Sequence, residues 1–271
     1  MLKILLARLQ QGHRTIKYPD GPAPALPDRF RGRPVIDASK CPEGCRACAD
    51  ACPTGAIAIN DKLQIDLGKC LFCTDCLSAC PEQALAYSTD YRLAVRQRAD
   101  LVLADDRQVL KLAGVLETKL RRMFGRSLKL RQVSAGGCNA CEADVNVLGT
   151  IGWDLGRFGI QMVASPRHAD GLLITGPVTR NMELALKKTY DAVAEPKLVI
   201  AVGACAISGG PYIDHRQVKG GADTLVPVDL YIPGCPPHPL TILDGLLRLL
   251  GRIEDGSRKE PAPGSAASAG A

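Results

Sequence analysis

The chain has 271 residues and a net charge of +6. Hydrophobic residues make up 46% of it and aromatic residues 4%, and twelve of its residues are cysteines. This length accommodates one large domain or two small ones. The longest apolar runs, such as residues 198–202, fall far short of the about 18 residues that cross a bilayer. Residues 1–9 carry Lys3 and Arg8 and lack the apolar core of a secretory signal, so we expect no export and reduced thiols. Reduced cysteines in this number exclude a disulfide scaffold and favour metal, and the scarcity of aromatic residues argues against nucleic acid as a partner.

The positive charge is concentrated in two segments. Residues 1–40 hold eight Lys and Arg against three acids, and residues 107–131 hold eight against Glu117. The rest of the chain is therefore acidic on balance. Two interpretations stay open for these segments: solvated basic faces, or docking onto anionic lipid or an acidic partner subunit.

An extended basic arm is predicted for residues 1–36, because residues 18–34 contain five prolines. It precedes an internal repeat in residues 37–90, in which Cys45, Cys48, Cys52 and Pro53 recur 28 positions later. Half-modules of this size cannot each build a core, so they must pack together around whatever the cysteines bind.

The second copy of the repeat has the spacing of bacterial ferredoxins, C-x2-C-x2-C-x3-C-P. In that pattern three closely spaced thiolates hold one 4Fe–4S cluster, and the fourth cysteine ligates the partner cluster. The spacing therefore predicts two sets of four ligands. Site 1 consists of Cys41, Cys45, Cys48 and Cys80, and site 2 of Cys70, Cys73, Cys76 and Cys52. A pair of structural zinc ions is the alternative, although zinc sites rarely need eight cysteines with such internal symmetry.

The first copy departs from the pattern, because three residues instead of two separate Cys41 from Cys45. Gly44 could absorb the extra residue by adopting a positive φ. The insertion leaves room for an altered cluster in site 1.

A linker, a second domain and a tail follow. The linker, residues 91–126, is expected to contain an amphipathic helix over 106–124, with Val109, Leu112, Leu116, Leu120 and Met123 as its apolar stripe. In residues 127–252, β-rich runs at 159–164, 171–175 and 197–202 surround a helical stretch over 181–194, with Asn181 as the expected N-cap. This alternation predicts a parallel sheet with helices on its faces, closed by a helix over 239–251. Residues 253–271 should be a disordered tail.

The four cysteines outside the repeat form the third predicted set, site 3: Cys138, Cys141, Cys205 and Cys235. Cys205 follows a predicted strand, and ligands in open α/β sheets gather at the carboxyl ends of strands. Glycines beside these cysteines would let the backbone approach a bulky cluster closely. Alternatively, Cys205 and Cys235 could be small buried apolar residues.

Two resemblances to known families follow from these motifs. Residues 10–90, with Tyr18-Pro19, Phe30-Arg31-Gly32-Arg33 and the paired cysteine motifs, resemble the two-cluster ferredoxin subunit of respiratory complex I and of formate hydrogenlyase. Residues 127–251, with motifs at 137–142, 165–170, 202–205 and 232–237, resemble the family of hydrogenase small subunits and the complex I 20 kDa subunit. That resemblance implies that the four cysteines of site 3 bind a 4Fe–4S cluster close to the partner's reaction centre.

The two resemblances imply a fold class and a function. The fold is an α+β ferredoxin-like module joined to an α/β flavodoxin-like domain, and the cofactors are three 4Fe–4S clusters. The implied function is electron transfer to or from the large catalytic subunit of a membrane-bound, energy-converting nickel–iron hydrogenase. The C-x2-C spacing of Cys138 and Cys141 is similar to those hydrogenases, whereas complex I members have adjacent cysteines there. The alternatives are a complex I-like NADH or ferredoxin:quinone oxidoreductase, a related complex without the metal centre, and a free soluble electron carrier.

The implied partners are that large subunit and other ferredoxin-type or membrane subunits. The implied location is cytoplasmic, on the inner face of the membrane through those subunits. Such hydrogenases commonly carry a glutamate three residues after the second cysteine; this position is Asp144 here, with Glu142 beside Cys141. Glu142 and Asp144 are therefore candidates for a proton relay. For Arg167 and His168, a surface hydrogen-bonding pair and a role near a cofactor or quinone are equally compatible with the sequence.

Overall fold

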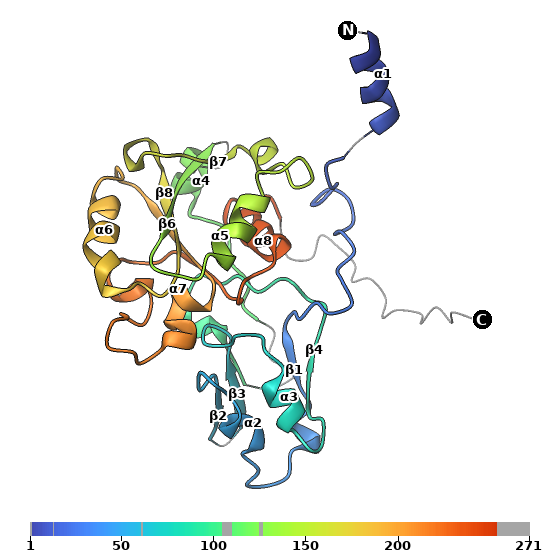
Figure 1. Cartoon of the computed structure of the whole chain (residues 1–271), viewed down its shortest axis with the longest axis vertical. Helices are drawn as coiled ribbons and strands as arrows, with labels where there is room; N and C mark the ends of the chain where they lie inside the picture. Colours follow the sequence, from blue (N-terminus) through green and yellow to red (C-terminus); the bar gives the residue numbers. More distant parts are fainter. Residues whose placement is uncertain (1, 13, 61, 105–109, 125–126, 254–271) are drawn as a thin grey trace, which may run out of the picture.

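The computed structural model describes residues 2–12, 14–60, 62–104, 110–124 and 127–253, and the predicted tail lies outside these residues apart from Ile253. Two modules are visible in Figure 1: a small β-rich module, and a larger module built on a parallel sheet. The predicted fold class, a ferredoxin-like α+β region joined to a parallel α/β domain, is confirmed. Among the described residues, no helix is both long and apolar enough to cross a membrane.

The smaller module is built around the sequence repeat. Strands β1 (Pro34–Ile36) and β4 (Leu85–Tyr87) form one antiparallel pair. Strands β2 (Ile57–Ile59), β3 (Leu63–Asp66) and β5 (Val102–Leu103) form an antiparallel sheet. Two short helices, α2 (Ala47–Asp50) and α3 (Asp75–Ala79), lie 28 positions apart and contact each other. The two halves of the repeat therefore pack together, as their small size requires.

The larger module has a five-stranded parallel sheet in the order β10-β9-β8-β6-β7. The strands are β6 (Leu128–Ser134), β7 (Ile160–Met162), β8 (Gly171–Thr175), β9 (Leu198–Val202) and β10 (Leu230–Ile232). All five residues of β8 and of β9 are buried, as expected for strands covered by other elements on both faces. The pairs Ser134–Thr175, Thr175–Val202 and Val202–Ile232 are in register, so four strands end along one line.

The helices of this module follow the strands. Helix α5 (Ala140–Val147) comes after β6, α6 (Arg180–Asp191) after β8, α7 (Ala204–Ser208) after β9 and α8 (Pro239–Leu249) after β10. The N-cap of α6 is Thr179 rather than the predicted Asn181, which lies inside the first turn. Leu186, in the middle of this helix, is fully buried.

The cores of the two modules are continuous. Leu172 and Ile174 of β8 pack in one apolar cluster with Ile65 and Leu101 of the smaller module, whereas Leu173 faces a second cluster with α8. The backbones of Val95 and Tyr231 exchange two hydrogen bonds, with N–O distances of 3.0 and 2.8 Å. The ferredoxin-like module is thus joined to the edge strand β10 and shares an apolar core with the parallel sheet.

The N-terminal arm differs from the extended conformation predicted for 1–36. Residues Leu2–Gln11 form helix α1, which projects from the body in Figure 1. The arm then runs along the larger module, where the Ile16 amide donates to Gly152 O at 2.9 Å. Residues 18–33 contain turns at 18–20 and 28–29 but no helix, in keeping with their prolines, whereas the leucine-rich segment before them contains no such helix breaker.

The linker also differs from its prediction. Residues 105–109, including Val109 of the predicted stripe, lie outside the described residues, residues 110–117 are not helical, and α4 spans only Thr118–Phe124. The amide of Ala113 donates to Ala94 O at 2.7 Å and that of Leu116 to Leu249 O at 3.0 Å. These tertiary hydrogen bonds replace the helical ones while Ala113 and Leu116 are still buried. Met123, which was expected in the apolar stripe of the helix, is 48% exposed.

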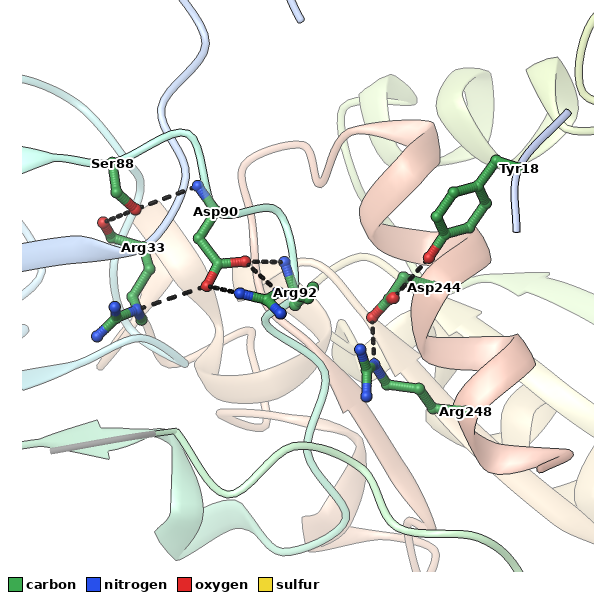
Figure 2. A network of polar contacts seen from close by, with 7 residues as sticks. All are labelled: Tyr18, Arg33, Ser88, Asp90, Arg92, Asp244 and Arg248. Carbon is green, nitrogen blue, oxygen red and sulfur yellow. Dashed lines mark hydrogen bonds and ion pairs between the residues drawn. The ribbon is translucent and has the colours of Figure 1, made fainter. Parts of the chain in front are cut away.

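Helix α8 is buried on every side, although its sequence suggests one polar face. Asp244 and Arg248 are 1% and 4% exposed, and Arg248 Nε donates to Asp244 Oδ2 at 2.8 Å. The hydroxyl of Tyr18, from the arm, donates to Asp244 Oδ1 at 2.7 Å, as Figure 2 shows. The arm therefore covers the face of α8 that would otherwise meet solvent.

Candidate metal centres

The structure brings together the four cysteines of site 1. Cys41, Cys45, Cys48 and Cys80 line one pocket of the smaller module. Gly44 there has a φ of +75°, so the extra residue between Cys41 and Cys45 is accommodated by the positive φ that the sequence suggested. Cys80 comes from the second copy of the repeat and the other three from the first. The pocket therefore combines cysteines of both copies, as the ferredoxin spacing predicts.

A second pocket collects the cysteines of site 2: Cys52, Cys70, Cys73 and Cys76. The rest of its lining is largely apolar, with Ile57, Ile65 and Leu85 among the contributing side chains. Here Cys52 is the residue contributed by the other copy. Each of the two sites therefore combines three cysteines from one copy of the repeat with one cysteine from the other.

The backbone around the cysteines repeats as well. The amide of Ala56 donates to Cys52 Sγ at 3.2 Å, and 28 residues later the amide of Ala84 donates to Cys80 Sγ at 3.3 Å. In site 2 the amide of Phe72 donates to Cys70 Sγ at 3.3 Å. Amide donors stabilise negative charge on sulfur, and hydrogen bonds to sulfur are one of the means by which proteins set cluster potentials.

Tyr87 is a residue that sequence reasoning missed. Its hydroxyl donates to Cys73 O at 2.9 Å and lies 3.9 Å from Cys70 Sγ. The first copy of the repeat has Ile59 at the equivalent position. That departure from the repeat is the sequence signal that could have revealed Tyr87.

Site 3 forms at the line where the strands of the parallel sheet end. Cys138 follows β6, Cys141 lies in α5, Cys205 lies in α7 directly after β9, and Cys235 follows β10. The register of these strands brings the four cysteines to one edge of the sheet, the edge at which Cys205 was expected. Cys138 and Cys235 are exposed, whereas Cys205 is buried and Cys141 half-buried.

Two glycines leave the space around site 3 open. A Cβ on Gly203, whose φ is +90°, would lie 2.5 Å from Cys141 Sγ. A Cβ on Gly210, whose φ is +56°, would lie 2.7 Å from Cys205 Sγ. Any side chain at either position would collide with a sulfur, so both glycines fit a bulky group held by these thiols.

The electrostatics of the thiols are consistent with a cationic ligand. Burial, followed by repulsion from neighbouring cysteines, raises the pKa of Cys76 to about 11 and that of Cys205 to about 12. Burial raises the pKa of Cys70 to about 12, and burial and Cys205 raise that of Cys141. Four thiolates in such surroundings need a positive partner, and iron–sulfur clusters are held by thiolates. The donor set thus fits 4Fe–4S clusters; within the described residues, no three Cys, His, Asp or Glu side chains converge closely enough for one metal ion.

Site 2 is a neighbour of both other sites. After burial and its own site's Cys73 and Cys52, Cys48 of site 1 also contributes to the raised pKa of Cys76 in site 2. For Cys235 of site 3, burial and Cys138 raise the pKa most, and Cys73 of site 2 adds to them. Site 2 therefore has one cysteine near site 1 and another near site 3.

Comparison with known proteins matches both modules. Residues 138–249 match the family described as NADH ubiquinone oxidoreductase, 20 Kd subunit, and residues 40–84 match a 4Fe–4S dicluster domain. A probable membrane-bound hydrogenase subunit of Pyrococcus furiosus is 39% identical over 50% of this chain and 81% of its own length. The chain belongs to this 20 Kd subunit family. It carries a dicluster domain in addition.

Other relatives of the family domain are similar to the chain over about half of its length. Formate hydrogenlyase subunit 7 of Escherichia coli is 44% identical over 51% of this chain, which spans 54% of that relative. An NADH-quinone oxidoreductase subunit of Clostridium beijerinckii is 47% identical over 43% of the chain and 70% of its own length. A solved chain of an archaeal membrane-bound sulfane sulfur reductase is 36% identical, covers 52% of this chain and 78% of its own, and superposes with a TM-score of 0.44.

The two acidic candidates beside site 3 of the family domain differ from each other. Burial would raise the pKa of Glu142, but hydrogen bonds with Ser134 and Thr175 outweigh it and lower the pKa. The Thr175 hydroxyl donates to Glu142 Oε1 at 2.7 Å. Burial raises the pKa of Asp144. Arg167 and His168 lie exposed in the turn Pro166–His168 and line neither of the two pockets of the smaller module.

Proposed function

We propose that the chain is the electron-transfer subunit of a membrane-bound, hydrogenase-like complex and holds three 4Fe–4S clusters in sites 1, 2 and 3. The observation that carries the proposal is the grouping of all twelve cysteines into three sets of four, of which site 2 neighbours both of the others. When bound, such clusters take up and release single electrons. The chain's own role is to position them, exclude water and set their potentials.

The described contacts support that role. Amides of Ala56, Phe72 and Ala84 donate to ligand sulfurs, and the apolar lining of site 2 lowers the local dielectric. The hydrogen bonds between Val95 and Tyr231 and the one from Ser208 Oγ to Gly68 O, at 2.9 Å, fix the spacing between modules. A fixed spacing is what a fused ferredoxin offers over a diffusing one, because its effective concentration near the acceptor is high.

The partner is proposed to be a large catalytic subunit docked at site 3. Cys138 and Cys235 of this site are exposed, whereas the eight cysteines of sites 1 and 2, all of them described, are half-buried or buried. The C-x2-C spacing of Cys138 and Cys141 favours an energy-converting nickel–iron hydrogenase. The similarity to the NADH-quinone oxidoreductase subunit of Clostridium beijerinckii supports a second candidate, a complex I-like quinone oxidoreductase. In both cases other ferredoxin-type or membrane subunits complete the complex on the cytoplasmic side of the membrane.

Anaerobic purification of the native complex through a tag on this chain tests the proposal. We expect a large subunit to co-purify and to carry paired C-x2-C motifs for nickel, with hydrogen-dependent reduction of the chain's visible absorption. A large subunit without those motifs would move the assignment to the quinone oxidoreductase. A monodisperse single chain recovered from native membranes would instead indicate a free carrier and contradict the proposal.

A further inference from the structure

Helix α1 has an apolar face that the rest of the described chain leaves uncovered. Every residue of Leu2–Gln11 is exposed, and Figure 1 shows the helix standing clear of both modules. Its leucines are Leu2, Leu5, Leu6 and Leu9, between 49% and 78% exposed. Their i, i+3, i+4, i+7 spacing places them along one stripe of the helix.

Positive charge borders this stripe on both sides. At 100° per residue, Lys3 follows one edge of the leucine stripe and Arg8 precedes the other. Residues 2–19 contain four Lys and Arg and no acidic residue. In the part of the chain that the structure describes, no ion pair includes any of these four: Lys3, Arg8, Arg14 and Lys17.

The arm that follows α1 is attached beside another exposed apolar residue. Shortly after α1 ends, Thr15 Oγ1 donates to Ile151 O at 3.0 Å, and Arg157 Nη1 donates to Ile16 O at 2.7 Å. Ile151, in the loop that follows α5, is 75% exposed. The attachment point of the arm therefore presents an aliphatic side chain of its own.

From these observations we propose that α1 lies in the headgroup region of an anionic lipid surface, with its leucine stripe toward the acyl chains. A ten-residue helix is about 15 Å long, enough to lie in the interface but not to cross it. Aliphatic residues on one side, with basic side chains at the borders that can extend to the phosphates, are the pattern of interfacial helices. The positive charge of residues 2–19 matches anionic lipid in sign. This contact would be the chain's own and does not depend on which complex it joins.

Ile4 provides a matched control for the test. It is 73% exposed and lies on the side of the helix opposite the leucine stripe. A change of Ile4 to Glu therefore alters charge and hydrophobicity as Leu5→Glu does, but away from the proposed contact.

The experiment is co-sedimentation of the full chain, reconstituted anaerobically with iron and sulfide, with two kinds of vesicle. One contains phosphatidylglycerol and phosphatidylethanolamine, and the other phosphatidylcholine alone. We expect preferential binding to the first, and for Ile4→Glu a loss no larger than the about fivefold that one unit of charge costs. Leu5→Glu should bind at least about tenfold more weakly than Ile4→Glu, because it also removes an aliphatic contact. Lys3→Gln and Arg8→Gln should each reduce the preference for anionic vesicles by about fivefold. Visible absorption and circular dichroism check that each variant is folded.

Two results would overturn the proposal. One is binding that is absent, or equally affected by Leu5→Glu and Ile4→Glu. The other is vesicle binding that survives Leu5→Glu while recovery of partner subunits from cells is lost, because the stripe would then contact a protein.

Discussion

The hydroxyl of Tyr18 donates a hydrogen bond to Asp244 Oδ1 at 2.7 Å, across 226 positions of the chain. Asp244 also accepts from Arg248 Nε, and all three side chains are buried (Figure 2). The ring of Tyr18 packs edge-on against Tyr91, with centroids 6.0 Å apart. The arm, the linker and the last helix thus meet at one buried carboxylate, beside the half-buried network of Arg33, Ser88, Asp90 and Arg92.

Tyr18→Phe should destabilise the chain by about 1–3 kcal/mol, because a buried acceptor loses its donor while the ring packing is kept. The midpoint of denaturant unfolding, followed by circular dichroism, measures the effect. Tyr212→Phe is the control, since Tyr212 is 46% exposed. Equal stability of the Tyr18→Phe and Tyr212→Phe variants would show that the hydrogen bond contributes nothing.

Arg248→Met should cost about 3–5 kcal/mol, since it leaves Asp244 buried without its counter-charge. Burial already raises the pKa of Asp244 above its usual value, against the opposing influence of Arg248 and Tyr18. The control is Arg46→Met, which breaks an exposed Arg–Asp pair with the same four-residue spacing. That pair is expected to contribute about 0.5 kcal/mol or less. Similar losses in the two variants would contradict the importance of burial.

Asp229→Asn should be at least as stable as the parent at neutral pH. Burial raises the pKa of Asp229, so the folded chain holds this proton more tightly than the unfolded chain. The stabilisation that this proton gives the folded chain is therefore fully present below the unfolded pKa of Asp229, about 3.9. It is lost as the pH rises through the folded pKa. Asparagine can still accept from the Val199 amide, which donates to Asp229 Oδ2 at 2.8 Å.

Thermal unfolding midpoints over the acidic to neutral range check this, within the range where the visible absorption stays unchanged. The advantage of Asp229→Asn should shrink toward low pH. Asp28→Asn removes one exposed negative charge and serves as the control. If the stability advantage of Asp229→Asn over the parent grew as the pH fell, the pKa of Asp229 would be lowered by folding rather than raised, which would contradict this prediction.

Gly203→Ala should reduce the iron content by about a third, or about four atoms per chain, by closing site 3. The reason is the collision of the new Cβ with Cys141 Sγ, together with the positive φ of Gly203. Gly152→Ala is the control, because its Cβ would meet no atom within 4 Å. Iron per folded chain is the measurement, and unchanged iron in Gly203→Ala would contradict the placement of site 3.

The sequence was informative where chemistry imposes a spacing. The 28-residue repeat predicted which cysteines share a pocket, and the exchange of Cys52 and Cys80 between copies followed from the ferredoxin pattern. The strands around 171–175 and 198–202 were identified because strands buried on both faces leave continuous apolar runs.

The sequence was misleading where distant segments decide the local structure. Ala113 and Leu116 have helical spacing, but their amides pair with Ala94 and Leu249, partners that no local pattern reveals. Asp244 and Arg248 mark a polar face of α8 that the arm then buries. Helix α1 was missed because proline-rich residues 18–34 dominated the interpretation of the whole arm.

The central claim is that twelve cysteines hold three 4Fe–4S clusters, and iron analysis of the anaerobically purified chain tests it most directly. The account predicts about twelve iron and twelve acid-labile sulfide per chain, with electron paramagnetic resonance of interacting clusters after dithionite reduction. About eight iron per chain, or zinc in place of iron, would contradict it.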